Sequence, residues 1–540
     1  MQQLLLPSGR VVGGSAILNA LIFSLGHKSD KAVRLFHSAE LFGSGTNSNG
    51  CHCKPELVNR HWTTTRIHDA LRDLFHGLGI PVHNESNGWI SEGLYTPLVF
   101  TENGKRWHPY EKCLHPVLSS NNADVFVAPN TVVDRLVWDE KLSDLAAGVR
   151  LVHRGIPISA MLSTSTSMHI PRSEVVLSAG AFETPSILLR SGIGPSDVYK
   201  PELNITQRKE LPVGYNLHDH PVVGVICKLA SSVTINSRSL TLMEILRYWW
   251  KGEGLLAHSS ALTSVAYLRT SVQREQNRTG PDIQLTFVAA AAIEHDTFRK
   301  LGNFNPTAWR RFIPSNGENS SDTMVILVTV VTPQSRGRVR LRSSSVFELS
   351  EPFPQPEVDP AYLTHPTDLE RLVEALSWIW AVFRGVPNCY RPARPESQRA
   401  SFSLHLEHRS APEARMALRQ LSLEPHLPNY PSCPTIPKCT DKSEEETLGL
   451  WDAALVCLVR SAIISNFHYA GTSPVQGVAG PVLSERLSVL HIKNVRVADA
   501  SVIPVLPSSN PATLVMSIGQ YAAKHILNDY ERQLDNSVEF

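Results

Sequence analysis

The 540-residue chain is poor in the features that define several protein classes. Its eight cysteines are too few for a fold held by disulfide bonds, and none forms the paired Cys-x-x-Cys pattern of a structural zinc site. Its 51 basic and 50 acidic residues give a net charge of +1, which offers no support for a nucleic-acid partner. What remains is a globular protein whose length suits two domains or one large interleaved architecture.

Long apolar runs are also missing. The patch from Met1 to Leu6 is short and ends at Pro7, without the basic start and cleavage site of a secretory signal peptide. The most apolar later stretch, Leu448 to Ile464, contains Asp452 and Arg460, which favours a buried helix over a membrane span. We therefore predict no transmembrane segment, while the sequence leaves the compartment and the oligomeric state open.

Several well-known catalytic motifs do not occur. There is no Gly-x-Ser-x-Gly elbow, His-Glu-x-x-His helix or Walker loop, so hydrolase, zinc protease and nucleotidase functions lack support. Cys51-His52-Cys53 places two thiols one residue apart without a second pair, and we predict no metal site there or elsewhere. Cys433 and Cys439 are close enough in the chain for one local disulfide bond.

The patterns that are present indicate mixed helices and strands. A glycine turn and an apolar stretch over Gly9–Gly26 predict a buried helix, and Thr65–Leu78 has the spacing of an amphipathic helix that ends at Gly79. The stretch 391–440 is rich in Pro, Arg, Ser and His and is interpreted as a surface insertion. Further helices are predicted at Pro366–Phe383, Glu444–Ile464 and Ala512–Asn528, and strands at Val125–Val127, Thr131–Trp138, Gly148–Val152, Glu174–Ser178, Asp282–Val288, Met324–Val331, Gly337–Leu341 and Val495–Ala498.

Two turn-to-helix junctions carry capping signals. Thr184 is predicted to cap a helix that begins at Pro185 and ends before Gly192. Asn510 is predicted to cap a second helix with Pro511 as its first residue, and the free amides there would favour negative charge. On local grounds both are ordinary helix starts, and a histidine such as His468 is more often structural than catalytic.

Taken together, seven segments resemble, in order, those of the glucose-methanol-choline (GMC) flavoprotein oxidoreductases. The first is Gly9-Arg-Val-Val-Gly-Gly-Ser15, followed by Asn19 and Gly26, with Ala16 where Ser or Thr is usual. The remaining segments span Gly180–Gly194, Leu211–His220, Ser335–Val339, Val358–Leu363, His468–Thr472 and Arg496–Pro504. Such an ordered series over most of the chain is hard to obtain by chance.

The resemblance implies an α/β fold, α+β overall, in which a discontinuous FAD-binding Rossmann-like domain is joined to a substrate domain built on an antiparallel sheet. It divides the chain into a GMC N-terminal region at 1–222, a substrate-domain sheet at 223–332 and a GMC C-terminal region at 333–528, with 391–440 as the insertion. FAD is the implied cofactor.

The resemblance also implies roles for individual residues. His468 matches the active-site histidine that accepts the alcohol proton as hydride moves to flavin N5, and Asn510 matches the residue that hydrogen-bonds the same oxygen. The helix starting at Pro511 would direct its positive end toward the flavin. Other implied FAD contacts are Gly13, Gly14, Asn19 and Ile22 at the flavin, Val133 on the adenine side, and Asp499 and Ala500 near the ribityl and diphosphate groups.

One departure from the family pattern is large. The strand, Gly-x-Gly-x-x-Gly and helix that hold the FAD diphosphate are not found in these 540 residues; Gly43-Ser-Gly45 comes nearest but has Ser48 where the third glycine is needed. Without those amides FAD should bind weakly, so we expect the chain to begin inside the cofactor domain.

Three functions stay open at this point. The first is an FAD-dependent oxidation of an alcohol CH–OH group, with oxygen or a quinone as electron acceptor. The second is a biosynthetic lyase or cyclase on the same fold without net redox chemistry, and the third is a catalytically inactive truncated homologue. The sequence does not identify the alcohol, nor whether FAD is covalently attached.

Overall fold

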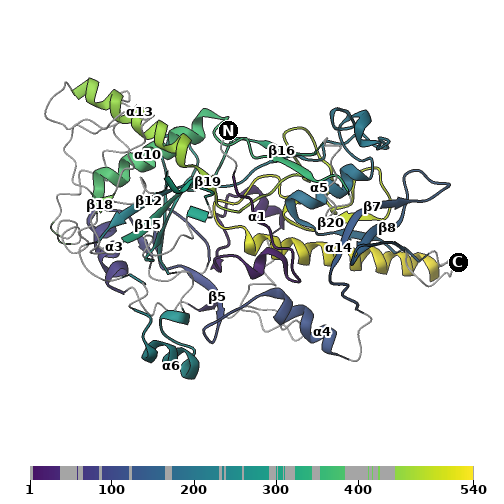
Figure 1. Cartoon of the computed structure of the whole chain (residues 1–540), viewed down its shortest axis with the longest axis horizontal. Helices are drawn as coiled ribbons and strands as arrows, with labels where there is room; N and C mark the ends of the chain where they lie inside the picture. The colour runs from purple at the N-terminus through teal and green to yellow at the C-terminus, as the bar shows by residue number, and fades with distance from the viewer. Residues whose placement is uncertain are drawn as a thin grey trace.

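The structure is a computed structural model that describes most of the chain (Figure 1). The described residues are 4–36, 57–58, 65–83, 88–120, 125–163, 173–229, 234–235, 239–257, 261–290, 299–300, 302–307, 309, 323–342, 353–383, 412, 416, 424–425 and 444–538. In this part of the chain no helix is long and apolar enough to cross a bilayer, and no group of three or more His, Cys, Asp or Glu side chains could hold a metal ion. Cys51-His52-Cys53 and the Cys433 and Cys439 pair lie outside it.

The largest sheet has eight strands, and its main strands pair antiparallel (Figure 1). The strand order is β18-β12-β15-β14-β13-β4-β3, and β19 also pairs with β12. This confirms the predicted antiparallel sheet and the strands expected near residues 282 and 324. The bounds are β3 (Val82–His83), β4 (Gly93–Tyr95), β12 (Pro221–Lys228), β13 (Leu262–Leu268), β14 (Ile283–Val288), β15 (Thr323–Val330), β18 (Glu424–Pro425) and β19 (Ile464–Ser465).

Alternating side chains divide this sheet into two faces. On β14, Leu285 and Phe287 join a core with three helices, α3 (Thr65–Gly77), α10 (Pro366–Phe383) and α13 (Glu444–Ala462). Gln284 and Thr286 project from the opposite face, because successive residues of a strand alternate. All three helices were predicted from their periodicity, and α10 has the predicted bounds.

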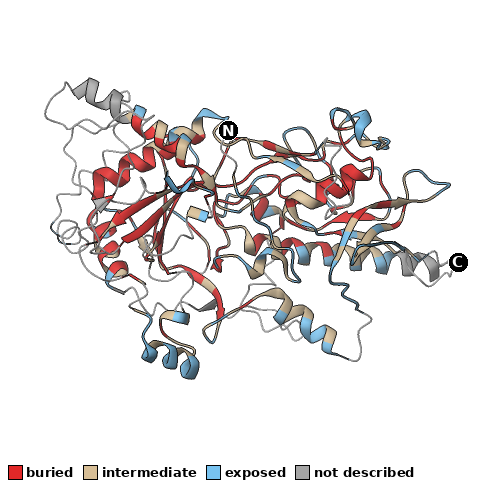
Figure 2. Ribbon diagram, in the orientation of Figure 1, coloured by how far each residue is buried: buried red, intermediate tan, exposed pale blue. Residues whose placement is uncertain are grey.

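A second core lies at the other end of the molecule, around α5 (Gly180–Arg190) and α14 (Ala512–Val538) (Figure 2). It contains the parallel pair β10 (Val175–Leu177) and β20 (Val495–Val497), which brings together segments more than 300 residues apart. The smaller elements of the fold are α1 (Lys31–Phe36), β1 (Ile22–Phe23), β2 (Leu57–Val58), β5 (Leu98–Glu102), β6 (Lys105–Arg106), α4 (His115–Ser119), β7 (Thr131–Trp138), β8 (Ala146–His153), β9 (Ile156–Met161), β11 (Tyr215–Leu217), α7 (Ser271–Glu275), β16 (Gly337–Leu341) and β17 (Pro356–Asp359).

Helix α5 begins five residues earlier than predicted, because Thr184 does not cap it. Its first amide, that of Gly180, donates to the Asp499 carboxylate at 2.8 Å, so the acceptor comes from a distant segment. Pro185 lies inside the helix and has no N–H for the carbonyl of Ala181. That carbonyl accepts from the Thr472 hydroxyl at 2.7 Å instead, and the helix ends before Gly192 as predicted.

Two other local predictions are wrong. Gly9–Gly26 contains only a single 3-10 turn, η1 (Gly14–Ile17), followed by β1, which pairs with β5. Leu21 has a positive φ of 64°, which interrupts any helix, and tertiary packing then favours a strand. Val125–Val127 forms no strand, and Phe126 is 92% exposed.

The stretch 391–440 lies mostly outside the described residues, but Glu424 and Pro425 are placed. These two residues form β18, which pairs with β12 at the edge of the large sheet and buries Pro425. This piece is therefore part of the sheet rather than a surface loop. Cys113 and Cys457 are each disulfide-bonded, which the sparse cysteines did not indicate.

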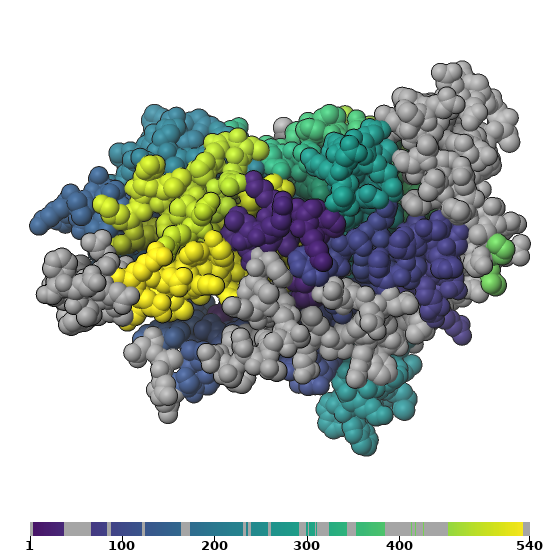
Figure 3. Space-filling model, turned by 180° about the vertical axis from the view of Figure 1, so that it is seen from behind, coloured from purple at the N-terminus to yellow at the C-terminus, as the bar shows by residue number. Residues whose placement is uncertain are grey.

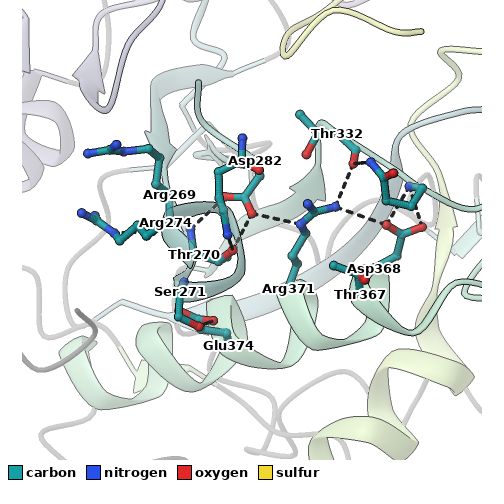
Figure 4. Close-up of polar contacts among 12 residues, drawn as sticks. Arg269, Thr270, Ser271, Arg274, Asp282, Thr332, Thr367, Asp368, Arg371 and Glu374 are labelled. Carbon is teal, nitrogen blue, oxygen red and sulfur yellow. Dashed lines mark hydrogen bonds and ion pairs between the residues drawn. The ribbon is translucent and has the colours of Figure 1, made fainter. Parts of the chain in front are cut away.

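A buried ionic network fixes α10 to the sheet (Figure 4). The fully buried Arg371 donates from Nε to Asp282 at 3.0 Å and from a terminal nitrogen to the Thr332 carbonyl at 2.8 Å, and it lies 3.5 Å from Asp368. Burial raises the pKa of Asp282, and the Arg371 charge opposes that rise. The start of β14 is thereby held against α10, two residues before Gln284.

Replacing Arg371 should destabilise the protein strongly. In Arg371→Ala two buried carboxylates lose their cation, and we expect a loss of about 3–5 kcal/mol in the free energy of unfolding. Arg340→Ala is the matched control, since its pair with Glu357 is exposed at the surface and should contribute about 0–1 kcal/mol. Urea denaturation of both variants measures the difference; equal losses would contradict this account of the network.

Candidate active site

Two segments far apart in the sequence form the centre of the site. Residues 464–470 run antiparallel to residues 218–222, with Ser465 opposite Pro221 and Ala470 opposite His218. Between these two pairs the chain runs three residues, from Pro221 to His218, on one segment and five residues, from Ser465 to Ala470, on the other. Residues 466–469 therefore form a bulge in the strand pairing. Phe467, with a positive φ of 63°, lies in this bulge and His468 follows it. The bulge directs His468 away from the strand.

The Asp219 carboxylate holds the bulge in place. One oxygen accepts from the backbone N–H of His468 and from that of His220, each at 2.8 Å. The other accepts from the hydroxyls of Tyr362 and Ser465. Backbone amides that a bulge would leave unpaired are thus satisfied by one buried side chain.

His468 is bound on both sides of its ring. Its Nδ1 lies 2.9 Å from Nδ1 of His220, and its Nε2 lies 3.2 Å from the Asn510 amide nitrogen. Gln284 of β14 donates to the Asn510 oxygen at 3.3 Å. The structure therefore brings together the two predicted catalytic residues, with a second histidine and a glutamine that were not predicted. Asn510 contacts these side chains, whereas it was predicted to cap α14.

Burial sets the protonation of these groups. It lowers the pKa of His468 to about 3, and it lowers that of the fully buried His220 well below its usual value. It raises the pKa of Asp219 to about 6, against the opposing effect of its four hydrogen bonds. At neutral pH both histidines are neutral and the Asp219 carboxylate is largely ionised.

Four of the predicted cofactor residues lie beside this centre. Asp499 caps the short turn at Ala500 and accepts from Gly180 and Thr184 of α5, so its carboxylate is already bound within the protein. The Ala500 carbonyl accepts from the amide of Gly471, three residues after His468. Ile22 packs against the face of the sheet that carries Gln284, and the neighbouring Phe23 belongs to a cluster that contacts Ala512, directly after Pro511.

The other four predicted cofactor residues have other partners in the described part of the chain. Gly13 has a φ of 101°, a conformation that favours glycine because other residues rarely adopt it. Gly14 follows it at the start of η1, and Asn19 accepts from Arg106. Val133 lies on β7. Among the described residues no hydrogen bond joins any of these four to His468 or Asn510, and their role in binding FAD stays a prediction.

The start of α14 offers groups that fit a flavin. The hydroxyls of Ser509 and Thr513 are buried on either side of Asn510 and Pro511, and neither has a hydrogen-bond partner in the described part of the chain. The first amides of a helix also lack partners within it. Unpaired donors at the positive end of a helix suit an electron-rich ring edge such as the flavin pyrimidine, so the residues present are compatible with FAD.

Five contributors to the site were not predicted from the sequence: Asp219, His220, Gln284, Tyr362 and Ser465. Asp219 and His220 were within reach of sequence reasoning, because they end the segment Leu211–His220 that resembles the family. Gln284 lies in an ordinary strand, and only the packing of β14 against Asn510 reveals it.

Comparison with known proteins identifies the family. The two models of the GMC oxidoreductases match residues 1–222 and 333–519. The mitochondrial choline dehydrogenase of Homo sapiens is 26% identical over 542 residues, covering 96% of this chain and 75% of that protein. The alcohol dehydrogenase [acceptor] of Pseudomonas putida is 23% identical over 559 residues, covering 99% and 84%.

A solved structure shows the same fold. A formate oxidase variant from Aspergillus oryzae superposes with a TM-score of 0.68 at 19% identity, over 97% of this chain and 85% of that one. The chain belongs to the GMC oxidoreductases, as its sequence motifs predicted. It is an FAD-dependent oxidoreductase of a family that acts on alcohol-type donors.

The raised pKa of Asp219 predicts a pH dependence of stability. The pKa of Asp219 is about 6 in the folded protein and 3.8 ordinarily, so folding favours its protonated form. This preference stabilises the folded protein below about pH 4, and the stabilisation is lost as the pH rises through about 6. The free energy of unfolding of the wild type, relative to Asp219→Asn, should therefore fall between these pH values.

Urea denaturation across this range measures the difference. Asp139→Asn is the control, because backbone amides lower the pKa of Asp139 and its contribution should be flat above pH 4. A difference between wild type and Asp219→Asn that grows with pH would contradict the assignment.

Proposed function

We propose that this protein oxidises an alcohol CH–OH group to a carbonyl, with His468 as the base and Asn510 as the residue that orients the alcohol oxygen. One observation carries the proposal: Nε2 of His468 and the Asn510 amide nitrogen face each other at 3.2 Å, from segments 42 residues apart. Both side chains are only partly buried, so a substrate oxygen can reach them. An imidazole and a neutral amide on one oxygen are suited to removing its proton.

The hydrogen bonds around His468 favour the protonation state that a base needs. Gln284 donates to the Asn510 oxygen, which leaves the Asn510 NH₂ group to face His468. An amide NH₂ can only donate, so Nε2 of His468 is the unprotonated nitrogen, and its lone pair accepts from Asn510 until a substrate hydroxyl takes that place. The single proton of the neutral ring is then on Nδ1, donated to Nδ1 of His220. Four side chains thus fix one tautomer.

The reaction balances with these groups. The alcohol O–H proton goes to Nε2 of His468, and the C–O bond becomes C=O as the carbinol carbon loses hydride. FAD, when bound, supplies the acceptor for that hydride. Pro511 and the buried hydroxyls of Ser509 and Thr513 would hold its pyrimidine edge at the start of α14.

A lyase or cyclase without net redox chemistry would use the same base. The family assignment favours oxidation, because the similar proteins are named as dehydrogenases of choline and of alcohols. The same proposal includes the division of the chain into regions 1–222, 223–332 and 333–528. It also includes the FAD contacts predicted for Gly13, Gly14, Asn19 and Val133.

Removing the base should abolish catalysis without loss of cofactor. In His468→Ala we expect flavin reduction by an alcohol to slow by about 10²–10⁴-fold, because proton removal loses its acceptor. FAD content should match the wild type. His76→Ala, an exposed histidine on α3, is the control and should reduce normally. Stopped-flow absorbance measures the rates; an unaltered rate in His468→Ala would remove His468 from its proposed role.

The rate of flavin reduction should show no loss at low pH from protonation of His468. Because burial lowers the pKa of His468 to about 3, the ring stays neutral from pH 5 to 8 and Nε2 remains able to take a proton. The rate of flavin reduction should therefore vary by less than about twofold from this group over that range. A fall in rate toward low pH with an apparent pKa near the ordinary histidine value would contradict the assignment.

A further inference from the structure

Helix α6 (Leu242–Lys251) stands out from the body and exposes large apolar side chains. Figures 1 and 3 show it projecting from opposite viewpoints, and Figure 2 shows it mostly exposed. Leu242, Met243, Trp249 and Trp250 are 71%, 72%, 82% and 84% exposed. Ile245 and Leu246 are exposed between them. Soluble proteins rarely present such a group of neighbouring apolar side chains without a partner.

The polarity of α6 is reversed relative to an ordinary surface helix. At about 100° per residue, its six exposed apolar residues cover an arc of about 160°. Glu244 and Tyr248 lie on the opposite side and are the half-buried residues of the helix. Glu244 accepts from the amide of Leu255, so the polar side faces the protein and the apolar side faces outward.

The helix is held rigidly in this orientation. The Thr241 hydroxyl accepts from the amide of Glu244 at its start, and Gly252 ends it with a φ of 63°. Gly252 packs directly on Gly104 of the β5–β6 hairpin, where a Cβ on Gly104 would lie 2.1 Å from the Gly252 oxygen. Only glycine allows that contact, which docks α6 on the hairpin.

Two unpaired cations lie near the end of α6; at about 100° per residue Lys251 falls outside the apolar arc, on the side of Glu244. Lys251 ends the helix and Lys105 begins β6, one on each side of the Gly104–Gly252 contact. Both are exposed, and among the described residues neither forms an ion pair. The acidic residues beside them are engaged, since Glu244 and Glu253 both lie within 4 Å of Arg247.

We infer that α6 binds the surface of a lipid bilayer that carries anionic headgroups. An arc of about 160° on a projecting helix is wider than a flat contact would cover, whereas insertion at the headgroup boundary buries all of it. Tryptophan is favoured at that boundary because its ring is apolar and its N–H remains wet. Lys251 and Lys105 match the charge of anionic headgroups. The helix is too short to cross the bilayer and would lie in its surface.

Vesicle co-sedimentation of the full chain tests this inference without requiring catalysis, so its outcome is separate from that of the proposed function. We expect the wild type to bind vesicles of phosphatidylcholine with phosphatidylglycerol more tightly than phosphatidylcholine alone. Replacing both Trp249→Gln and Trp250→Gln should reduce partitioning on the order of tenfold or more. Phe126→Gln, at an exposed aromatic residue away from α6, is the matched control and should bind like the wild type.

A second variant tests the role of charge. Replacing both Lys105→Glu and Lys251→Glu should weaken binding to the anionic vesicles and leave the weaker binding to phosphatidylcholine vesicles unchanged. Wild-type protein that remains in the supernatant would overturn the inference, as would equal binding by the double tryptophan variant. Sedimentation velocity tests whether a second copy of the chain covers the face instead. If the wild type is a dimer that does not bind vesicles, and the double tryptophan variant is a monomer, the face is a dimer interface and the inference is wrong.

Discussion

The site depends on the Asp219 carboxylate inside a bulged antiparallel ladder. It accepts from the backbone amides of His220 and His468 and from the hydroxyls of Tyr362 and Ser465. Burying a carboxylate is costly, as its raised pKa shows, and four hydrogen bonds offset that cost. In return the two histidine rings meet at a fixed angle and distance, which regular strand pairing would not provide.

A second set of contacts ties this centre to both cores. Thr472, four residues after His468, donates to the carbonyl of α5 that Pro185 leaves free. On the sheet side, Gln284 reaches Asn510 from β14, whose start is held by Arg371 of α10. His468 and Asn510 therefore lie between the core around α5 and α14 and the large sheet, and both parts of the fold supply contacts to the site.

The sequence predicted the periodic elements and the two central side chains. The spacing of Pro366–Phe383 was sufficient for α10, because its apolar face is buried along its whole length. The cap at Thr184 was wrong since the acceptor, Asp499, comes from 315 residues later. The helix over Gly9–Gly26 failed for a similar reason, because pairing with β5 outweighs local pattern. His468 was identified only through its motif, and no local signal marks Gln284.

The most direct test of the central claim is to mix the FAD-loaded protein with an alcohol in the absence of air and follow the flavin absorbance. The account predicts that the oxidised flavin band bleaches as the alcohol becomes a carbonyl, because the hydride has no other acceptor. Conversion of the substrate while the flavin stays oxidised would contradict it and would favour a lyase or cyclase on the same fold.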